Sequence, residues 1–388
     1  MPNETPLEEL FLPGTGTIPP HLAGRGREQD YFNRCLRTLV EGRPIAQDMI
    51  VYGPRGNGKT ALLRSLQKNI SGGDDDILSA WTTPDKIKTP RMLFERIAAA
   101  GQKGRKWFKQ FSANIQVAGH GGGLSIDRGS EWGLIDTSIA FGELCKQTPF
   151  VLIIDEAHML EPDVAQDLLN TSQDVRGEGK AFFLVLAGTP GLRNRMSLAG
   201  ASFWSRSRKF AVGRLSPKES IEALVKPLQD FGITFAPDVV EDVVRRAQRY
   251  PFFIQLWGQA LCMQIQRGEI IDAAHVQAAQ GMAGEERDMM YVDRYNELRN
   301  AGYLGIARHL THLFREKGPT IQEKILREKV EKYCAKEGKD GLETLLGLED
   351  LGYVWQTHSN PIAYEAGIPS LMSYVAAQLQ KQNVGIKM

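Results

Sequence analysis

Residues 53–60 read GPRGNGKT, and this octapeptide is the stretch that decides the fold. It fits the pattern GxxxxGK[ST], in which glycines allow a tight turn whose backbone N–H groups point at phosphate oxygens. Lys59 is expected to reach the β- and γ-phosphates of a nucleotide, and the Thr60 hydroxyl is expected to bind Mg²⁺. A helical pattern follows, and the partial positive charge at a helix N-terminus favours an anion. The residues predicted to contact the nucleotide in this loop are Gly53, Pro54, Arg55, Gly56, Asn57, Gly58, Lys59, Thr60 and Ala61.

A second pair of polar residues follows an apolar run further along the chain. Phe150–Ile154 reads FVLII, which is typical of a strand buried on both faces of a parallel sheet. Asp155 and Glu156 come directly after it. Beside a phosphate-binding loop, this order predicts that Asp155 holds Mg²⁺ and that Glu156 orients and deprotonates an attacking water. His158 completes the letters DEAH known from some helicases, but no second sheet follows, so we expect His158 to begin a helix.

Short apolar runs alternate with helical patterns over the first half of the chain. Such alternation indicates an α/β domain of three layers, with helices on both faces of a parallel sheet. Together with the phosphate-binding motif it predicts the P-loop αβα fold. The expected strands are 48–52, 77–81, Phe150–Ile154, 181–187 and 210–212.

After residue 215 the pattern changes to helices alone. Ser216 and Glu219 have the spacing of a capping box, with Pro217 at the first helical position. From about residue 296, three helices and a two-stranded hairpin are expected, an order typical of a winged helix. The helices expected in the two regions are 237–249, 251–267 and 272–283, then 302–316, 321–337 and 340–351. The hairpin strands are 353–358 and 362–365, joined by a turn at 359–361.

The chain has 388 residues, enough for several domains. The division predicted from these patterns has four parts. It comprises an extended N-terminal segment at 1–20, a nucleotide-binding core at 21–215, a helical lid at 216–295 and a winged-helix-like domain at 296–388.

Composition narrows the class of protein. The sequence is 42% hydrophobic and 24% charged, as in a globular domain, and its net charge of +1 gives no overall attraction to nucleic acid or to a membrane surface. Its apolar runs fall well short of the roughly 20 residues that a membrane span needs. The four cysteines are far apart and form no CxxC pair, which argues against zinc ribbons and disulfide frameworks. These features predict a cytoplasmic protein.

With these motifs, the chain resembles the AAA+ ATPases. The resemblance is strongest to the origin-recognition-type initiators and their archaeal and bacterial ATPase relatives, a branch that borders on the STAND signalling ATPases. Gly24 and Arg25 resemble the box that opens these domains and lies near the adenine. Thr189 matches the sensor-1 position, from which a hydroxyl would bond the γ-phosphate or the lytic water. The resemblance implies ATP and Mg²⁺ as cofactors.

Two further residues are assigned by the same resemblance. Arg206 precedes the fifth strand, where the family places an arginine finger that completes a neighbouring subunit's site; Arg208 is the alternative. Pro251 resembles the proline of the lid turn that reads the nucleotide state. However, Arg249 stands where a glycine is usual, and 252–257 contains no sensor arginine. This departure predicts a slow switch rather than a fast motor.

Two segments bear on the choice of partner. Residues 101–129 exceed the minimal fold and read as a Gly-rich hairpin that begins in a mixed basic and aromatic stretch. Such a hairpin is either a surface feature or a DNA contact. The helix expected at 340–351 carries four carboxylates and no basic residue, so it would repel DNA phosphates. We therefore expect the C-terminal domain to bind protein or to pack on the ATPase core.

Three functional hypotheses follow from the sequence. The first is a slow ATPase that acts as a nucleotide-controlled switch on a partner protein or on its own homo-oligomer. The second is a DNA-binding ATPase that resembles initiators or transposition regulators. The third is a non-hydrolysing STAND-like adaptor, for example in anti-phage defence.

Overall fold

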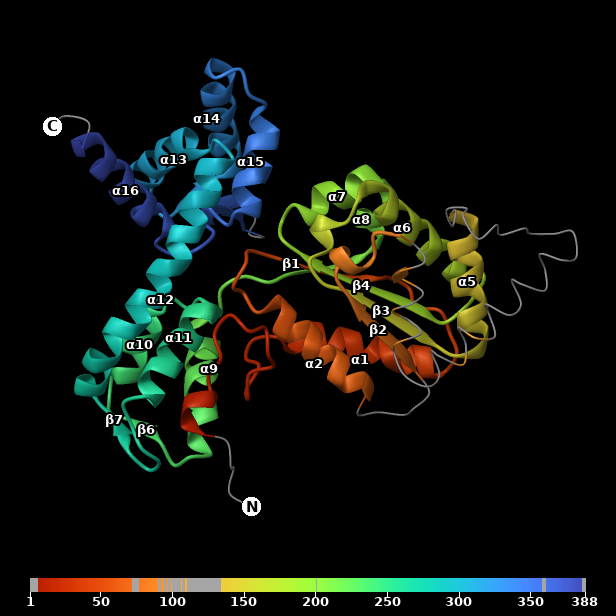
Figure 1. The fold of residues 1–388 in the computed structure, drawn as a ribbon, viewed down its shortest axis with the longest axis horizontal. Coiled ribbons are helices and arrows are strands. Elements are labelled where there is room, and N and C mark those ends of the chain that lie inside the picture. Colours follow the sequence, from red (N-terminus) through yellow and green to blue (C-terminus); the bar gives the residue numbers. More distant parts are fainter. Residues whose placement is uncertain are drawn as a thin grey trace, which may run out of the picture.

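The computed structural model describes residues 6–71, 77–89, 134–199, 201–357 and 361–385, together with isolated positions between 92 and 109. Figure 1 shows a sheet flanked by helices, a helical part beside it, and a C-terminal part reached through one long helix. The extra segment predicted at 101–129, with its basic and aromatic lead-in, falls outside the described residues apart from isolated positions.

Five parallel strands form the central sheet, in the order β2-β3-β4-β1-β5. β4 pairs with β1 on one side and with β3 on the other. The strand before the phosphate loop and the strand before the acidic pair are therefore separated by a single strand. The strands are β1 (Met49–Tyr52), β2 (Leu78–Thr82), β3 (Phe150–Ile154), β4 (Phe182–Gly188) and β5 (Arg208–Ala211).

The sheet is buried on both faces, and successive strand residues alternate between two cores. Val51 packs with α1 (Gly26–Val40) and α2 (Lys59–Ser71), whereas Ile50 packs on the opposite face. This arrangement, visible in Figure 1, confirms the predicted P-loop αβα fold. The helices of the second face are α5 (Leu134–Gln147), α6 (Pro162–Gly177), α7 (Leu192–Ala199) and α8 (Ala201–Arg206).

The predicted strands lie in the right places, with shifted ends. The clearest shift is in β5, which begins at Arg208 rather than at residue 210. Arg208 and Lys209 pair with Met49 and Ile50, but both side chains are exposed and give no apolar signal in the sequence.

The helical part follows β5 and begins with the predicted cap. Ser216 Oγ accepts from the N–H of Glu219 at 3.3 Å, and the Glu219 carboxylate accepts from the N–H of Ser216 at 2.8 Å. The prediction of helices alone is wrong at one point, because two strands of two residues each pair in parallel here. Strands this short leave no periodic pattern to read. The elements are α9 (Pro217–Gln229), β6 (Thr234–Phe235), α10 (Val239–Arg246), α11 (Pro251–Cys262), β7 (Ile270–Ile271) and α12 (Ala273–Asn300).

α12 is the longest helix that the structure describes, and its predicted end at residue 283 is wrong. The whole helix has 28 residues, so the domain boundary predicted between residues 295 and 296 falls inside it. Gly281 and Gly284 both lie where an added Cβ would meet nothing, and the helix passes through them. Its second half is held by the C-terminal part, where the Tyr291 hydroxyl donates to the carbonyl of Pro369 at 2.7 Å.

The C-terminal part has the element order of a winged-helix-like domain. Its sheet has three strands in the order β8-β10-β9 rather than the two predicted, and a final helix follows that was not predicted. β8 was missed because three residues directly before a helix read as part of that helix. The first two residues of the expected turn at 359–361 fall outside the described part of the chain. The elements are α13 (Leu304–Lys317), β8 (Thr320–Gln322), α14 (Glu323–Lys336), α15 (Gly341–Asp350), β9 (Val354–Gln356), β10 (Ala363–Ala366) and α16 (Leu371–Gly385).

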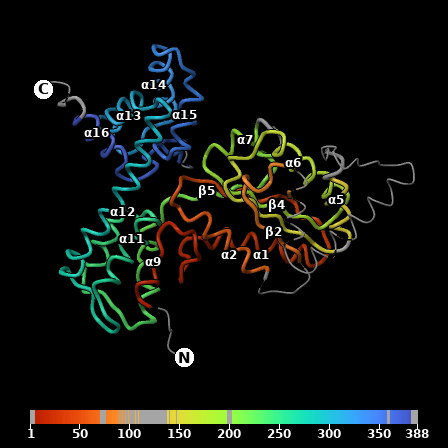
Figure 2. The backbone as a smooth tube through the Cα atoms, viewed as in Figure 1, coloured from red at the N-terminus to blue at the C-terminus, as the bar shows by residue number. Residues whose placement is uncertain are grey.

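The described part of the N-terminal segment packs against the rest of the chain. Figure 2 shows this red stretch running beside α9 towards the start of α2. Phe11 is fully buried, and a Cβ on Gly258 of α11 would lie 2.4 Å from its ring, so glycine is needed there. Among the described helices, none has both the length and the apolar composition of a membrane span.

A buried carboxylate ties three elements of the sheet domain together. Asp48, which precedes β1, accepts from the Ser172 hydroxyl at 2.6 Å and from the N–H of Leu184 at 3.0 Å. Arg176 of α6 lies 3.0 Å from the same carboxylate. Burial raises the pKa of Asp48 and Arg176 opposes that rise, so the pair is a buried ion pair whose members depend on each other.

We expect Asp48→Ala to lower the free energy of unfolding by about 3–5 kcal/mol, because Arg176 would lose its partner in the interior. Urea denaturation measures this loss. The double variant Asp48→Ala/Arg176→Met serves as control and should lose less than the two single variants combined. A single variant within about 1 kcal/mol of the wild type would contradict the importance of the pair.

Candidate functional site

The candidate site lies at the carboxyl edge of the sheet, where β1, β3 and β4 end. The phosphate loop follows β1 and continues into α2, and Asp155 follows β3. The Thr60 hydroxyl donates to Asp155 Oδ2 at 2.7 Å, across 95 residues of sequence. The structure thus brings together the two side chains predicted to hold Mg²⁺.

Lys59 is buried beneath the loop. Its ammonium group donates to the carbonyl oxygens of Gly53 at 2.9 Å and Pro54 at 3.0 Å. Burial lowers the pKa of Lys59 to about 8, an effect opposed by Glu156 and Asp155. These bonds to carbonyls can be exchanged for bonds to phosphate oxygens, which are stronger because both partners are charged.

The pair formed by Thr60 and Asp155 fits Mg²⁺. A hydroxyl and a carboxylate are hard oxygen ligands, and Mg²⁺ in nucleotide sites uses one or two such groups together with phosphate and water. Burial raises the pKa of Asp155, against the effect of the Thr60 hydrogen bond. A cation would reverse this shift. Among the described residues, no group of three or more His, Cys, Asp or Glu side chains forms a metal cluster of another kind.

Glu156 has a strained backbone and a side chain that lines the cavity. Its φ is 53°, in the left-handed region, and its N–H donates to Asp155 Oδ1 at 2.9 Å. His158 Nε2 lies 3.5 Å from its carboxylate, while Nδ1 accepts from the N–H of Thr189 at 3.3 Å. Burial lowers the pKa of His158 to about 4, so the ring is neutral and Nε2 carries the proton. His158 therefore connects Glu156 to Thr189.

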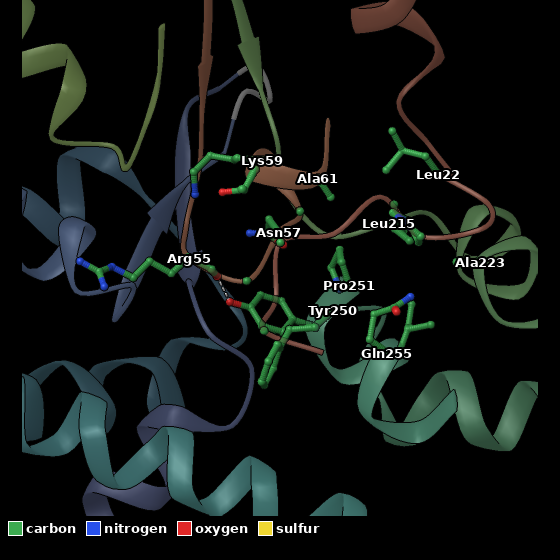
Figure 3. A pocket seen from close by; sticks show the side chains of 18 of the residues that line it. Leu22, Arg55, Asn57, Lys59, Ala61, Leu215, Ala223, Tyr250, Pro251 and Gln255 are labelled. Carbon is green, nitrogen blue, oxygen red and sulfur yellow. Dashed lines mark hydrogen bonds between the residues drawn. The ribbon is translucent and has the colours of Figure 1, made fainter. Parts of the chain in front are cut away.

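A cavity of about 410 Å³ opens from the loop towards the helical part. In Figure 3, Lys59 and Asn57 mark its phosphate end, and Leu22, Leu215 and Ala223 are grouped at some distance from them. The apolar end is suited to a nucleotide base, since ligand pockets combine an apolar body with a few polar groups.

Arg25 lines this cavity, and Gly24 lies between the lining residues Ala23 and Arg25. Arg25 is 6% exposed and donates to the carbonyls of Asn57 at 3.0 Å and Gly213 at 3.2 Å. It joins the loop to the segment after β5. Gly24 has a φ of 67°, and a Cβ there would collide with Glu219 and Leu215. The two residues thus shape the cavity from behind the loop.

The lid touches the phosphate loop directly. The Tyr250 hydroxyl donates to the carbonyl of Arg55, drawn as a dashed line in Figure 3, and the N–H of Phe252 donates to Gly56 at 3.1 Å. Pro251 lies between these two contacts and lines the cavity. The preceding Arg249 has a φ of 57°, which explains why a glycine would be favoured there. Its presence costs about 1 kcal/mol in backbone strain.

Sequence reasoning missed Arg294, which lines the cavity from α12. Burial lowers its pKa, and the guanidinium pairs with Glu297 one turn away. It places a basic side chain at the cavity, which 252–257 does not contain. No local signal could have found it, because α12 was expected to end before this position and the approach of α12 to the loop depends on tertiary packing. The N-terminal segment was also missed as a lining element; it contributes Leu12, Gly14, Gly16 and Thr17.

Two of the predicted site residues, Arg206 and Thr189, have surroundings that differ from those of the loop residues. Arg206 ends α8, and the adjacent β5 pairs so that Arg208 lies opposite Met49, at the amino edge of the sheet. Arg206 therefore lies away from its own phosphate loop. Thr189 is 1% exposed, and its hydroxyl donates to Asp350 of α15 at 2.7 Å. Of the two roles expected for the C-terminal domain, binding a protein or packing on the ATPase core, the structure shows packing at this contact.

Comparisons with known proteins agree with this geometry. Residues 46–196 match the family model described as an AAA domain. The vesicular-fusion protein SEC18 of Candida albicans is 26% identical over 106 residues, which is 25% of this chain and 12% of that relative. The chain thus spans only a small part of the curated relative that it matches.

Solved structures are similar over nearly the whole chain. The Walker-type ATPase of Pyrococcus abyssi gives a TM-score of 0.61 at 15% identity, covering 95% of this chain and 99% of that one. The Aeropyrum pernix ORC2 protein, in its ADPNP-ADP complexes, gives 0.53 at 14% identity, covering 97% and 100%. At these identities the likeness concerns the fold.

Residues 46–196 therefore match an AAA domain, and the fold of the chain is similar to those of a Walker-type ATPase and of an ORC2 protein. The predicted family resemblance is confirmed at this level.

The lowered pKa of Lys59 predicts how nucleotide affinity depends on pH. Only the ammonium form binds phosphate strongly, and this form is lost as the pH rises through about 8. We expect the affinity for ADP to be constant below pH 7.5 and to weaken by up to about tenfold per unit above pH 8. Fluorescence titration with a labelled nucleotide measures it.

Lys59→Arg is the matched control, since its guanidinium keeps its charge throughout this range. The variant should bind more weakly but with a flat profile. A wild-type profile as flat as that of the arginine variant would contradict the assignment.

Proposed function

We propose that this protein binds Mg²⁺-ATP and hydrolyses it slowly, as a nucleotide-controlled switch. One observation carries the proposal: Thr60 and Asp155 are joined at 2.7 Å next to the buried Lys59 ammonium, at the mouth of a cavity long enough for a nucleotide. The AAA domain match over residues 46–196 supports it independently.

Each residue has a proposed role. Lys59 and the loop amides hold the phosphates, and Thr60 and Asp155 hold Mg²⁺, which would neutralise phosphate charge. Glu156 acts as the base towards water, with His158 as the group that orients it. Gly24, Arg25 and Pro251 shape the base end of the cavity. Thr189 would bond the γ-phosphate or the lytic water once its hydroxyl is released from Asp350.

The switch character is supported by the way in which the parts are connected. The lid donates two hydrogen bonds to the loop through Tyr250 and Phe252. Arg294, from the same cavity, belongs to a helix that continues into the C-terminal domain. A change at the phosphates would therefore be passed to the C-terminal domain as a movement of α12. We propose that a partner protein or a second copy of the chain responds to this movement.

The two other hypotheses rank behind this one. A DNA-binding role has less support, because the acidic α15 turns Asp350 onto the ATPase core. Filter binding to duplex DNA at two salt concentrations tests it, since phosphate contacts weaken steeply with salt. A non-hydrolysing adaptor is distinguished by stoichiometric retention of nucleotide without turnover.

We expect Lys59→Ala to abolish ATP binding, because it removes the ammonium group that lies beneath the loop on the carbonyls of Gly53 and Pro54. Glu156→Gln should retain binding and lower kcat by about 10²–10⁴-fold, since it removes the base and keeps the shape. Calorimetry and phosphate release measure the two properties. If both variants hydrolyse ATP like the wild type, the proposed site is wrong.

The position of Arg206 predicts a site shared between subunits. We expect Arg206→Ala to lower kcat by about 10³-fold, and mixing it with Lys59→Ala to restore part of the activity. In the mixture, an intact arginine on one subunit completes an intact loop on the next. Arg208→Ala, two residues away and also exposed, is the control and should need no rescue. Full activity of Arg206→Ala alone would rule out the role.

A further inference from the structure

The C-terminal domain reaches into the ATPase core through one carboxylate. Asp350, the last residue of α15, accepts from the Thr189 hydroxyl at 2.7 Å. The same oxygen, Oδ1, accepts from the N–H of Gly191. Thr189 and Gly191 are the residues that directly follow β4 at the edge where the phosphate loop lies. One oxygen of the C-terminal domain therefore holds two donors of the core.

This contact is tightly packed and is supported on both sides. A Cβ on Gly191 would lie 2.1 Å from Asp350 Oδ2, so only a glycine leaves room for the carboxylate. Trp355 of β9 packs at 6.1 Å from Tyr52, the last residue of β1. Arg214 donates to the carbonyl of Ala366 at 2.8 Å. The contact is thus the centre of an interface between the C-terminal domain and the core, rather than an isolated surface pair.

The contact is in conflict with hydrolysis. The Thr189 hydroxyl has one hydrogen, and Asp350 takes it. The carboxylate also brings a negative charge to the strand end next to the one that delivers Asp155. A γ-phosphate placed there would meet a like charge at short range. Through His158, which accepts from the Thr189 N–H and lies 3.5 Å from the Glu156 carboxylate, the same contact affects the surroundings of the proposed base.

We propose that Asp350 is a latch with which the C-terminal domain holds the ATPase in a resting state. The latch and the γ-phosphate compete for Thr189, so ATP favours release of α15 and ADP allows it to close. By linkage, a partner that draws the C-terminal domain away strengthens ATP binding. It also frees the Thr189 hydroxyl for the γ-phosphate or the lytic water, which speeds hydrolysis. This inference rests on the proposed ATPase function and adds a mode of regulation to it.

Two different variants open the latch. Asp350→Ala removes the acceptor, and Gly191→Ala keeps the carboxylate but fills its place with a methyl group. Glu343→Ala is the control, because it removes the same charge from an exposed position of the same helix. We expect the two latch variants to raise the steady-state ATPase rate of the full chain about 5- to 20-fold, and the control to leave it unchanged.

A second measurement separates this inference from the function on which it rests. Small-angle scattering of the full chain should give a larger radius of gyration for both latch variants than for the wild type with ADP. Wild type with a non-hydrolysable ATP analogue should shift in the same direction. The radius of gyration does not depend on ATP turnover, so this measurement tests the latch even if the chain does not hydrolyse ATP.

The possible results of these two measurements distinguish the latch from the ATPase proposal. A higher rate or a larger radius in both Asp350→Ala and Gly191→Ala, with Glu343→Ala like the wild type, supports the latch. Wild-type rates and wild-type radii in both variants would overturn it while leaving the ATPase proposal intact. If the wild type shows no ATP turnover that depends on Lys59, the ATPase proposal is wrong. The scattering result alone then decides whether the latch exists.

Discussion

The hydrogen bond between Thr60 and Asp155 depends on a constraint that governs the rest of the structure: parallel strands end at the same edge of a sheet. Because β4 separates β1 from β3, the residues after all three strands face one small volume. That volume receives an ammonium group, a hydroxyl and two carboxylates from segments far apart in the chain. The lid and the C-terminal domain then add their own groups to the same edge.

The described parts of the chain are coupled through contacts at this edge, and breaking any of these contacts costs free energy. Tyr250 and Phe252 bring the lid to the loop, and Asp350 brings the C-terminal domain to β4. α12 links the two, with Arg294 lining the cavity and Tyr291 bonded to the final domain. A ligand that changes one of these contacts must shift the others, which is the property expected of a switch.

Sequence patterns predicted the local chemistry well and the long-range contacts poorly. The loop at 53–60 and the strand before Asp155 are each complete within a few residues, so spacing and residue type were sufficient. The length of α12, the strand β8 and the cation Arg294 depend on tertiary packing, which overrides weak local signals. The acidity of 340–351 argued against DNA and left protein binding or packing on the core open, and only the structure identifies Asp350 and Thr189 as a contact pair.

The central claim is that one Mg²⁺-nucleotide binds at the edge formed by Lys59, Thr60 and Asp155. Isothermal titration calorimetry of the full chain with ADP, in the presence and absence of Mg²⁺, tests it most directly. The account predicts one nucleotide per chain, with affinity that falls when the metal is removed and falls equally with Asp155→Asn. Absence of binding heat with Mg²⁺ present, or binding that ignores both the metal and Asp155, would contradict it.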